Sequence, residues 1–177
     1  MEGCVMPAVE AMTALGSSRL SANASSVTFS NIPSTDANGS AITDLYVSFS
    51  GTFTTSRYLA IQFNSDTGSN YNTQAYYANT TADVAGQVSN FTYFFASYYG
   101  SQSNAIRSGL IHIMDAKATD KHKNVLMRHN ATGDSNAAVE MMAGRWANNN
   151  PITSIKVYVD SGADFASDTI ISLYGVA

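Results

Sequence analysis

The sequence predicts an all-β fold, an antiparallel β-sandwich or jelly roll with a short N-terminal arm or helix. From residue 26 onward, apolar residues alternate with polar ones in short runs, which is the pattern of half-buried strands. Turn residues separate these runs about every ten to fifteen residues, and no helical pattern follows residue 25. Short strands at this spacing are typical of sandwiches. No repeat of fixed period points to a propeller or solenoid instead.

The composition describes one domain with an almost uncharged surface. Charged residues make up 12% of the 177 residues, about half the usual share, and the net charge is −4. Serine, threonine, asparagine and glycine take their place, as in extracellular β-proteins and in subunits of large assemblies. The charge argues against nucleic acid as a partner. No apolar run is long enough to span a membrane, no signal peptide is recognisable, and the single Cys4 excludes an internal disulfide.

Residues 1–25 differ from the rest and are expected to form an anchoring arm ahead of a sandwich domain of residues 26–177. The stretch from Pro7 to Leu15 is rich in alanine, with proline where a helix starts and Gly16 where it ends. A helix this short is marginal alone, so we expect it either to dock on a neighbour or to extend as an arm. The candidate partner-binding residues are Val5, Met6, Pro7, Val9, Met12, Leu15 and Leu20.

The sandwich is expected to contain nine or ten strands. In the run after Asn38-Gly39, for example, Leu45, Val47 and Phe49 alternate with polar or tyrosine residues. An aromatic cluster, Phe91 to Phe95, marks a strand near the middle of the chain. The expected strands cover residues 27–29, 45–53, 59–63, 74–77, 91–95, 106–114, 124–129, 138–144, 152–159 and 169–174.

The strand that begins at Leu59 runs into a polar loop, Asn64 to Asn70. Its oxygen-bearing residues alternate as in a Ca²⁺ loop. However, Gly68 lies one place early for such a loop, and Ala75 stands where a bidentate glutamate is needed. We therefore interpret the loop as a turn whose side chains bind its own backbone; a cation site completed by another loop is the alternative.

The chain offers little for catalysis, and we do not expect an enzyme, a metal or a cofactor. It has three glutamates and lacks both a Gly-x-Ser-x-Gly motif and a glycine-rich phosphate loop. No metal-ligand spacing links the three histidines, and His112 between two isoleucines is expected half-buried or facing a subunit. Positive charge gathers between Lys117 and His129. That cluster is either a patch for an acidic neighbour or anionic glycan, or a solvated loop between two strands.

A second group of residues could hold a sugar. Trp146, the only tryptophan, follows Arg145 and precedes three asparagines. Its ring could stack on a sugar, or it could close one end of the sandwich. Tyr98 and Tyr99 are further candidates for contact with a host glycan.

Several stretches in order resemble a known family. They are Phe29 to Ser34, Ile61 to Tyr71, Lys121 to Arg128, Trp146 with Ile152 to Ile155, and Phe165 to Val176. Together they resemble the small β-sandwich virion proteins of tailed bacteriophages, including many phages of cyanobacteria and marine bacteria. The resemblance covers residues 26–177 and implies a virion subunit assembled in the cytoplasm of a bacterial host. It brings no catalytic residues with it.

The resemblance leads to two expectations about function. The first is a capsid decoration (cement) protein, expected as a homotrimer, which docks on the major capsid protein through its N-terminal arm and stabilises the head. The second is the receptor-binding domain of a tail fibre or tailspike, which holds a host surface glycan. A free carbohydrate-binding or hydrolytic protein is a third reading, from another class.

Overall fold

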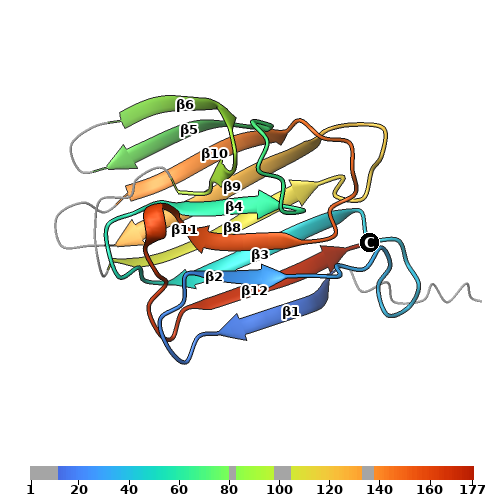
Figure 1. Ribbon diagram of the computed structural model, residues 1–177, viewed down its shortest axis with the longest axis horizontal. Helices are drawn as coiled ribbons and strands as arrows, with labels where there is room; N and C mark the ends of the chain where they lie inside the picture. Colours follow the sequence, from blue (N-terminus) through green and yellow to red (C-terminus); the bar gives the residue numbers. More distant parts are fainter. Residues whose placement is uncertain (1–11, 80–82, 98–104, 133–137) are drawn as a thin grey trace, which may run out of the picture.

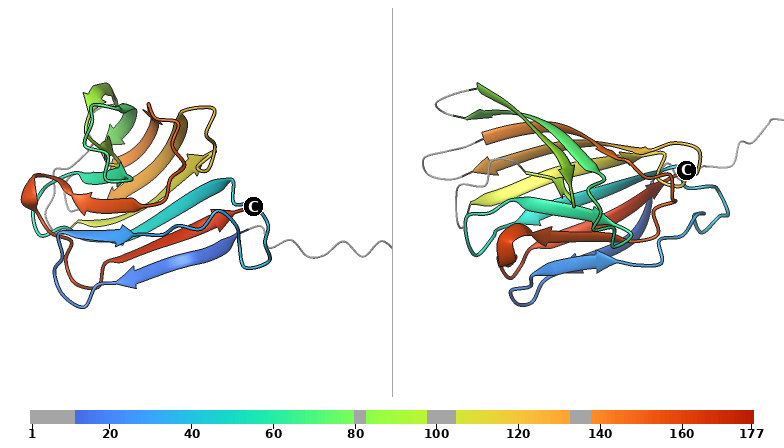
Figure 2. Two further views of the ribbon diagram at one scale, coloured as in Figure 1. Left: turned by 45° about the vertical axis from the view of Figure 1, so that its right-hand side comes forward. Right: turned by 45° about the horizontal axis from the view of Figure 1, so that its top comes forward.

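The computed structural model describes residues 12–79, 83–97, 105–132 and 138–177 (Figure 1). These residues form two antiparallel sheets that pack face to face, which confirms the predicted all-β sandwich (Figures 1 and 2). Their only helix is a short 3₁₀ turn, Asp160–Gly162.

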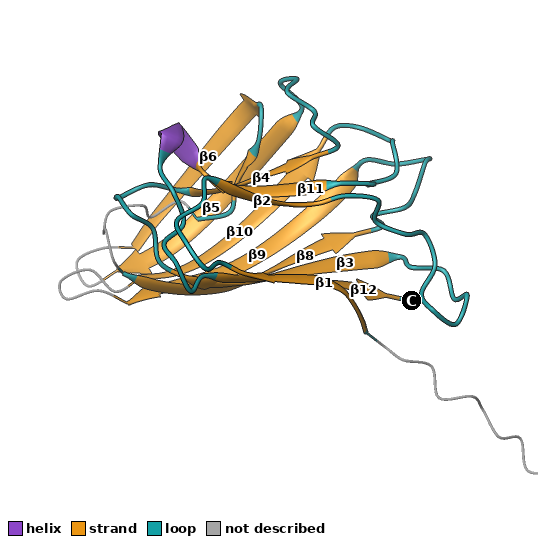
Figure 3. Ribbon diagram, turned by 60° about the horizontal axis from the view of Figure 1, so that its bottom comes forward, coloured by secondary structure: helices purple, strands orange, loops and turns teal. Residues whose placement is uncertain are grey.

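The large sheet has eight strands and the small sheet has four. In spatial order, the large sheet contains β1 (Thr13–Arg19), β12 (Ile170–Val176), β3 (Asp44–Gly51), β8 (Ile106–Met114), β9 (Lys123–Thr132), β10 (Ala138–Trp146), β5 (Tyr71–Asn79) and β6 (Asp83–Phe91). The small sheet contains β2 (Ser26–Phe29), β11 (Ile155–Val159), β4 (Leu59–Phe63) and β7 (Phe94–Phe95). Figure 3 shows β2, β11 and β4 on one side of the large sheet.

The core lies between the sheets, and in β3, β9, β10 and β11 it is filled mainly by every second residue. In β9, for example, Val125 and Met127 are buried, whereas Leu126 and Arg128 are exposed on the opposite side. We call this opposite side of the large sheet the outer face. It carries the side chains of Tyr46, Gln74, Tyr76, Leu110, His112, Leu126, Arg128, Met141 and Arg145, none of which is buried.

The N-terminal prediction is wrong where the structure describes it. Residues 13–15, the predicted end of a helix, belong instead to the edge strand β1, which pairs with β12 from Thr13 opposite Gly175 to Arg19 opposite Ile170. The predicted domain boundary at residue 25 therefore falls inside the sandwich. The physical reason is that the edge of β12 offers unpaired backbone groups, and this pairing outweighs the weak preference of a short alanine-rich helix.

The seven candidate anchor residues consequently divide into two sets. Leu15 and Leu20 pack against the core, so they hold the sandwich together and are not available as an anchor. Met12 is 49% exposed just ahead of β1. The other candidates lie outside the described residues: Val5, Met6, Pro7 and Val9.

Gly144 in β10 gives a direct test of how tightly the sheets pack. A Cβ atom added there would lie 2.5 Å from Cε1 of Phe94 and 3.2 Å from the backbone oxygen of Asn72. Phe94 is fully buried and packs against the rings of Phe63 and Tyr71, so it has little room to move. We expect Gly144→Ala to lower the free energy of unfolding by about 1–3 kcal/mol.

Urea unfolding would measure this loss. Ala143→Ser is the control, because residue 143 is exposed on the other face of the same strand. It should change stability by less than about 0.5 kcal/mol. Equal stability of Gly144→Ala and the control would contradict close packing of β10 against β7.

Candidate functional site

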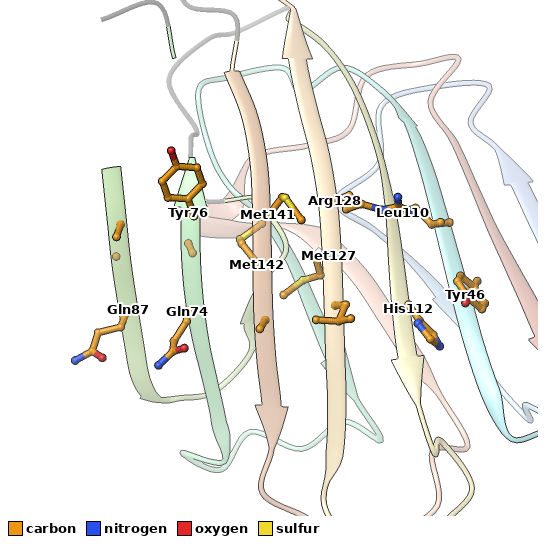
Figure 4. Close-up of a pocket in the computed structure, with 15 residues that line it drawn as sticks. Tyr46, Gln74, Tyr76, Gln87, Leu110, His112, Met127, Arg128, Met141 and Met142 are labelled. Atoms are coloured by element: carbon orange, nitrogen blue, oxygen red, sulfur yellow. The ribbon is translucent and has the colours of Figure 1, made fainter. Parts of the chain in front are cut away.

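A broad depression lies on the outer face. It has a volume of about 900 Å³ and crosses β3, β8, β9, β10, β5 and β6 (Figure 4). Its side chains are mixed: aromatic, aliphatic, amide and cationic groups lie side by side. The most prominent are Tyr46, Gln74, Tyr76, Gln87, Leu110, His112, Leu126, Arg128 and Met141.

Strand register explains why these side chains meet. One row of cross-strand neighbours runs from β6 to β3 through Gln87, Gln74, Ala143, Leu126, His112 and Tyr46. The adjacent row runs through Ala85, Tyr76, Met141, Arg128, Leu110 and Ser48. Because Ala143 and Ala85 are small and stand among larger side chains, the two rows leave a hollow between them.

An aromatic pair closes the hollow at the β3 side. The rings of Tyr46 and His112 stack with centroids 4.3 Å apart and planes 7° apart. Nε2 of His112 lies 2.6 Å from Oδ2 of Asp44, and the backbone N–H of Asp115 donates to Oδ1 of the same carboxylate over 2.9 Å. The carboxylate therefore fixes the histidine ring, and the histidine in turn supports the tyrosine.

Two smaller depressions adjoin the central one. One, of about 520 Å³, includes Ser108, Asn130 and Val139 and shares Leu110, Arg128 and Met141 with it. The other, of about 380 Å³, includes Asn72, Ser89 and Arg145 and shares Gln74, Gln87 and Ala143 with it. Because they share lining residues, the three form one elongated hollow, which we call the outer groove.

The charges that face the outer groove are mostly positive. Arg128 and Arg145 are exposed there, and no ion pair joins either of them to another described residue. Glu140 borders the groove, but it is 1% exposed and its carboxylate lies on the inner side, 3.7 Å from Nδ1 of His129. Asp44 is held by His112. The groove is thus cationic in a chain whose net charge is −4.

Of the residues predicted to hold a sugar, the structure places one in the groove. Arg145 lies in the smallest depression. Trp146, its neighbour, points to the opposite face and is completely buried among aromatic rings. A buried ring cannot stack on a sugar at the surface, so this candidate is wrong, and Trp146 instead closes the core at one end of β10. Tyr98 and Tyr99 lie outside the described residues.

The Asn64 to Asn70 loop is a structural corner, as predicted. Oδ1 of Asp66 accepts the backbone N–H of Gly68 at 2.8 Å. Its Oδ2 accepts Nδ2 of Asn70 at 2.9 Å and the indole N–H of Trp146 at 2.7 Å. Both carboxylate oxygens are thus engaged by the protein. Across the described residues, no group of three or more histidine, cysteine, aspartate or glutamate residues could hold a metal ion.

The basic cluster does not form a single patch. Lys117 donates through Nζ to the backbone oxygens of Ile32 and Ile152 at 2.8 and 2.6 Å. Lys123 and His129 are buried on the inner side, whereas Arg128 faces the outer groove. Alternation along β9 therefore separates residues that are neighbours in sequence, which neither interpretation of the cluster anticipated.

The outer groove itself was not predicted. Its residues come from six strands, and their alignment depends on a register that a single sequence does not reveal. One signal was present. Apolar residues occupy consecutive positions in β9 (Val125, Leu126 and Met127) and in β10 (Met141 and Met142), which indicates apolar side chains on both faces of those strands.

The fold and site together define a two-sheet antiparallel sandwich with one open, grooved face. No family model matches the chain, and no curated protein matches it. Among solved structures, the alginate lyase Aly36B is similar over 83% of this chain and 79% of its own, with 12% identity and a TM-score of 0.27. That TM-score is too low to assign a fold or an activity. No helix in the described residues has the length and apolar character needed to cross a membrane.

Proposed function

We propose that the chain is a structural protein of a tailed bacteriophage particle, a capsid decoration protein that binds the major capsid protein through the segment ahead of β1. The stretches that resemble this family lie in strands and in one corner of the sandwich. Ile61 to Tyr71 contains the Asp66 corner, Lys121 to Arg128 contains the first half of β9, and the C-terminal stretch forms β12. The resemblance of these stretches supports membership of the family of small virion proteins. The low surface charge supports the role of a subunit in a large assembly.

One observation carries the attachment part of the proposal. Thr13 pairs with Gly175, so the chain enters and leaves the sandwich at the same end of the β1–β12 edge. The opposite edge of the large sheet is β6, as Figure 1 shows. A subunit held through residues before Thr13 would keep its outer groove and most of its surface free. The self-association expected of such a subunit is a homotrimer, which sedimentation measurements can test.

A second candidate function is favoured by the outer groove. A receptor-binding domain of a tail fibre or tailspike needs a surface for host glycan, and Arg145 is one of the residues expected in such a surface. In that case the binding site of the protein would be the outer groove and not the N-terminal segment.

Truncation separates the two functions if it spares the fold. Removal of residues 1–24 would also remove β1 and expose the edge of β12, so the deletion must end at residue 11. We expect the full chain to cosediment with isolated capsids of the phage that encodes it. The chain lacking residues 1–11 should lose this binding by at least tenfold while its thermal unfolding midpoint is unchanged.

Two results would contradict the decoration proposal. If the truncated chain still coats capsids as well as the full chain, the N-terminal segment is not the anchor. If neither form binds capsids but both bind host cells, the receptor-binding function is correct instead.

A further inference from the structure

We propose that the outer groove is a binding site for an extended acidic polysaccharide. The proposal concerns the ligand of the groove and does not depend on how, or whether, the chain attaches to a capsid. It rests on three features of the groove: its shape, its lining and its charge.

The shape of the groove fits a chain-like ligand. From Gln87 on β6 to Tyr46 on β3 the first row crosses five inter-strand steps, or about 24 Å at the usual strand spacing. The depressions that contain Asn130 and Arg145 continue it on either side of that row. Several linked sugar rings can lie along such a hollow, whereas a compact metabolite would fill only part of it.

The lining matches the alternating chemistry of a sugar. Gln74 and Gln87 offer amide donors and acceptors for hydroxyl groups. Leu126 and Met141, 49% and 59% exposed, offer apolar contacts for the C–H faces of the rings, and so does the half-exposed ring of Tyr76. A lipid would require a more continuous apolar lining. A nucleic acid would require more than two cations along this length.

The charge selects an acidic polysaccharide. Arg128 lies near the middle of the groove, and Arg145 lies beside its first row, two residues along β10 from Ala143, so carboxylates or sulfates of one ligand chain could meet both. A protein segment is less well suited. Extended peptides bind β-proteins chiefly by pairing with a free sheet edge, whereas the groove lies on a face whose backbone groups are already paired.

Isothermal titration of the full-length protein with three polymers tests the proposal. Polygalacturonate carries carboxylates, dextran sulfate carries sulfate esters, and dextran is neutral. We expect at least one acidic polymer to bind, dextran not to bind, and the affinity to fall as salt concentration rises. Arg128→Gln and Arg145→Gln should each weaken binding about tenfold, as loss of a charge-assisted contact does.

A matched control distinguishes the groove from general charge. Arg57→Gln removes an exposed arginine from the loop that leads into β4 of the small sheet, away from the outer groove. It should leave the affinity within twofold of the wild type. All three arginines are exposed, so the variants should keep the wild-type unfolding midpoint, which thermal denaturation would verify.

Several outcomes would overturn the proposal. The proposal is wrong if neither acidic polymer binds. It is also wrong if Arg57→Gln weakens polymer binding as much as Arg128→Gln and Arg145→Gln do, because binding would then depend on general positive charge and not on the groove. Tight binding of the neutral polymer dextran would show that the arginines of the groove do not select an acidic ligand. Dimerisation that Met141→Glu abolishes, without polymer binding, would identify a second copy of the chain as the occupant.

Discussion

Asp66→Asn is expected to lower the free energy of unfolding by about 3 kcal/mol, a large loss for one surface-loop residue. The Asp66 carboxylate accepts hydrogen bonds from the backbone of Gly68 and the side chains of Asn70 and Trp146. Asparagine has nearly the same shape, but it lacks the charge and replaces one acceptor oxygen with an NH₂ donor. In either orientation of the amide, that donor faces another donor.

The effect should depend on pH in a defined direction. Burial on its own raises the pKa of Asp66, but hydrogen bonds from Asn70, Trp146, Gly68 and Asn148 more than offset it, so the pKa lies below its usual value of 3.8. A carboxyl whose pKa is lowered by folding stabilises the protein above its unfolded pKa and loses that contribution as pH falls through the folded pKa. The stability gap between wild type and Asp66→Asn should therefore be full at neutral pH and shrink below about pH 4.

Thermal and urea unfolding at pH 7 and at pH 3 would measure the gap. A loss of 3 kcal/mol corresponds to a midpoint shift of about 6–12 °C for a chain of this length. Asp83→Asn, at an exposed position at the start of β6, is the control and should shift the midpoint by less than 2 °C, about the effect of 0.5 kcal/mol. Wild-type stability of Asp66→Asn at pH 7 would contradict the role assigned to the corner.

Lys123→Met is expected to cost about 3 kcal/mol of unfolding free energy, because it removes three hydrogen bonds at once. The buried Nζ atom of Lys123 donates to the backbone oxygens of Ala118, Lys121 and Asn149 at 2.6, 3.0 and 3.2 Å. It thereby ties the loop between β8 and β9 to the loop after β10. Burial lowers the pKa of Lys123, Asp120 and Asp115 oppose that change, and Lys121 adds to it.

Methionine retains most of the volume of lysine, so this substitution tests the hydrogen bonds rather than the packing. Lys156→Met on β11 is the matched control, because Lys156 is exposed. Urea unfolding gives the free-energy change, and amide hydrogen exchange over residues 115–122 should quicken in Lys123→Met alone. Unchanged stability would mean that the cost of burying the ammonium cancels the three bonds.

Much of the sandwich could be predicted because its strands carry strong local patterns. Leu45, Val47 and Phe49 alternate with outward residues, and all three are buried in β3. Two strands escaped prediction for the opposite reason. β1 begins with Ala14 and Leu15, which also suit the end of a helix, and continues through Gly16, Ser17 and Ser18, which carry no strand pattern; β6 contains Ala85 and Gly86, which have weak strand preference. Both are edge strands, and their structure depends on the neighbour with which they pair.

The candidate site could be predicted much less well. Arg145 and Trp146 are adjacent in sequence and both are predicted to contact a sugar, yet strand alternation places Arg145 in the groove and Trp146 in the core. The partners of Arg145 in the groove come from strands far away in the chain, such as Ser89 on β6 and Asn72 on β5. The sequence indicates which residue types can bind a sugar. Which of those residues share one surface depends on the register of the sheet.

The pairing of Thr13 with Gly175 also determines how the molecule resists force. A pull between the two ends of the described chain acts at one end of the β1–β12 ladder, so its pairs would open one after another. The register places Thr13 in the same row as Gly144, between Ala143 and Arg145 of the outer groove, so a pull between the N-terminal end and a ligand there runs across the strands, parallel to their hydrogen bonds, and also loads the ladder from the Thr13 end. A subunit tethered ahead of β1 and loaded through its groove would therefore open first at the β1–β12 edge, beginning with the pair of Thr13 and Gly175.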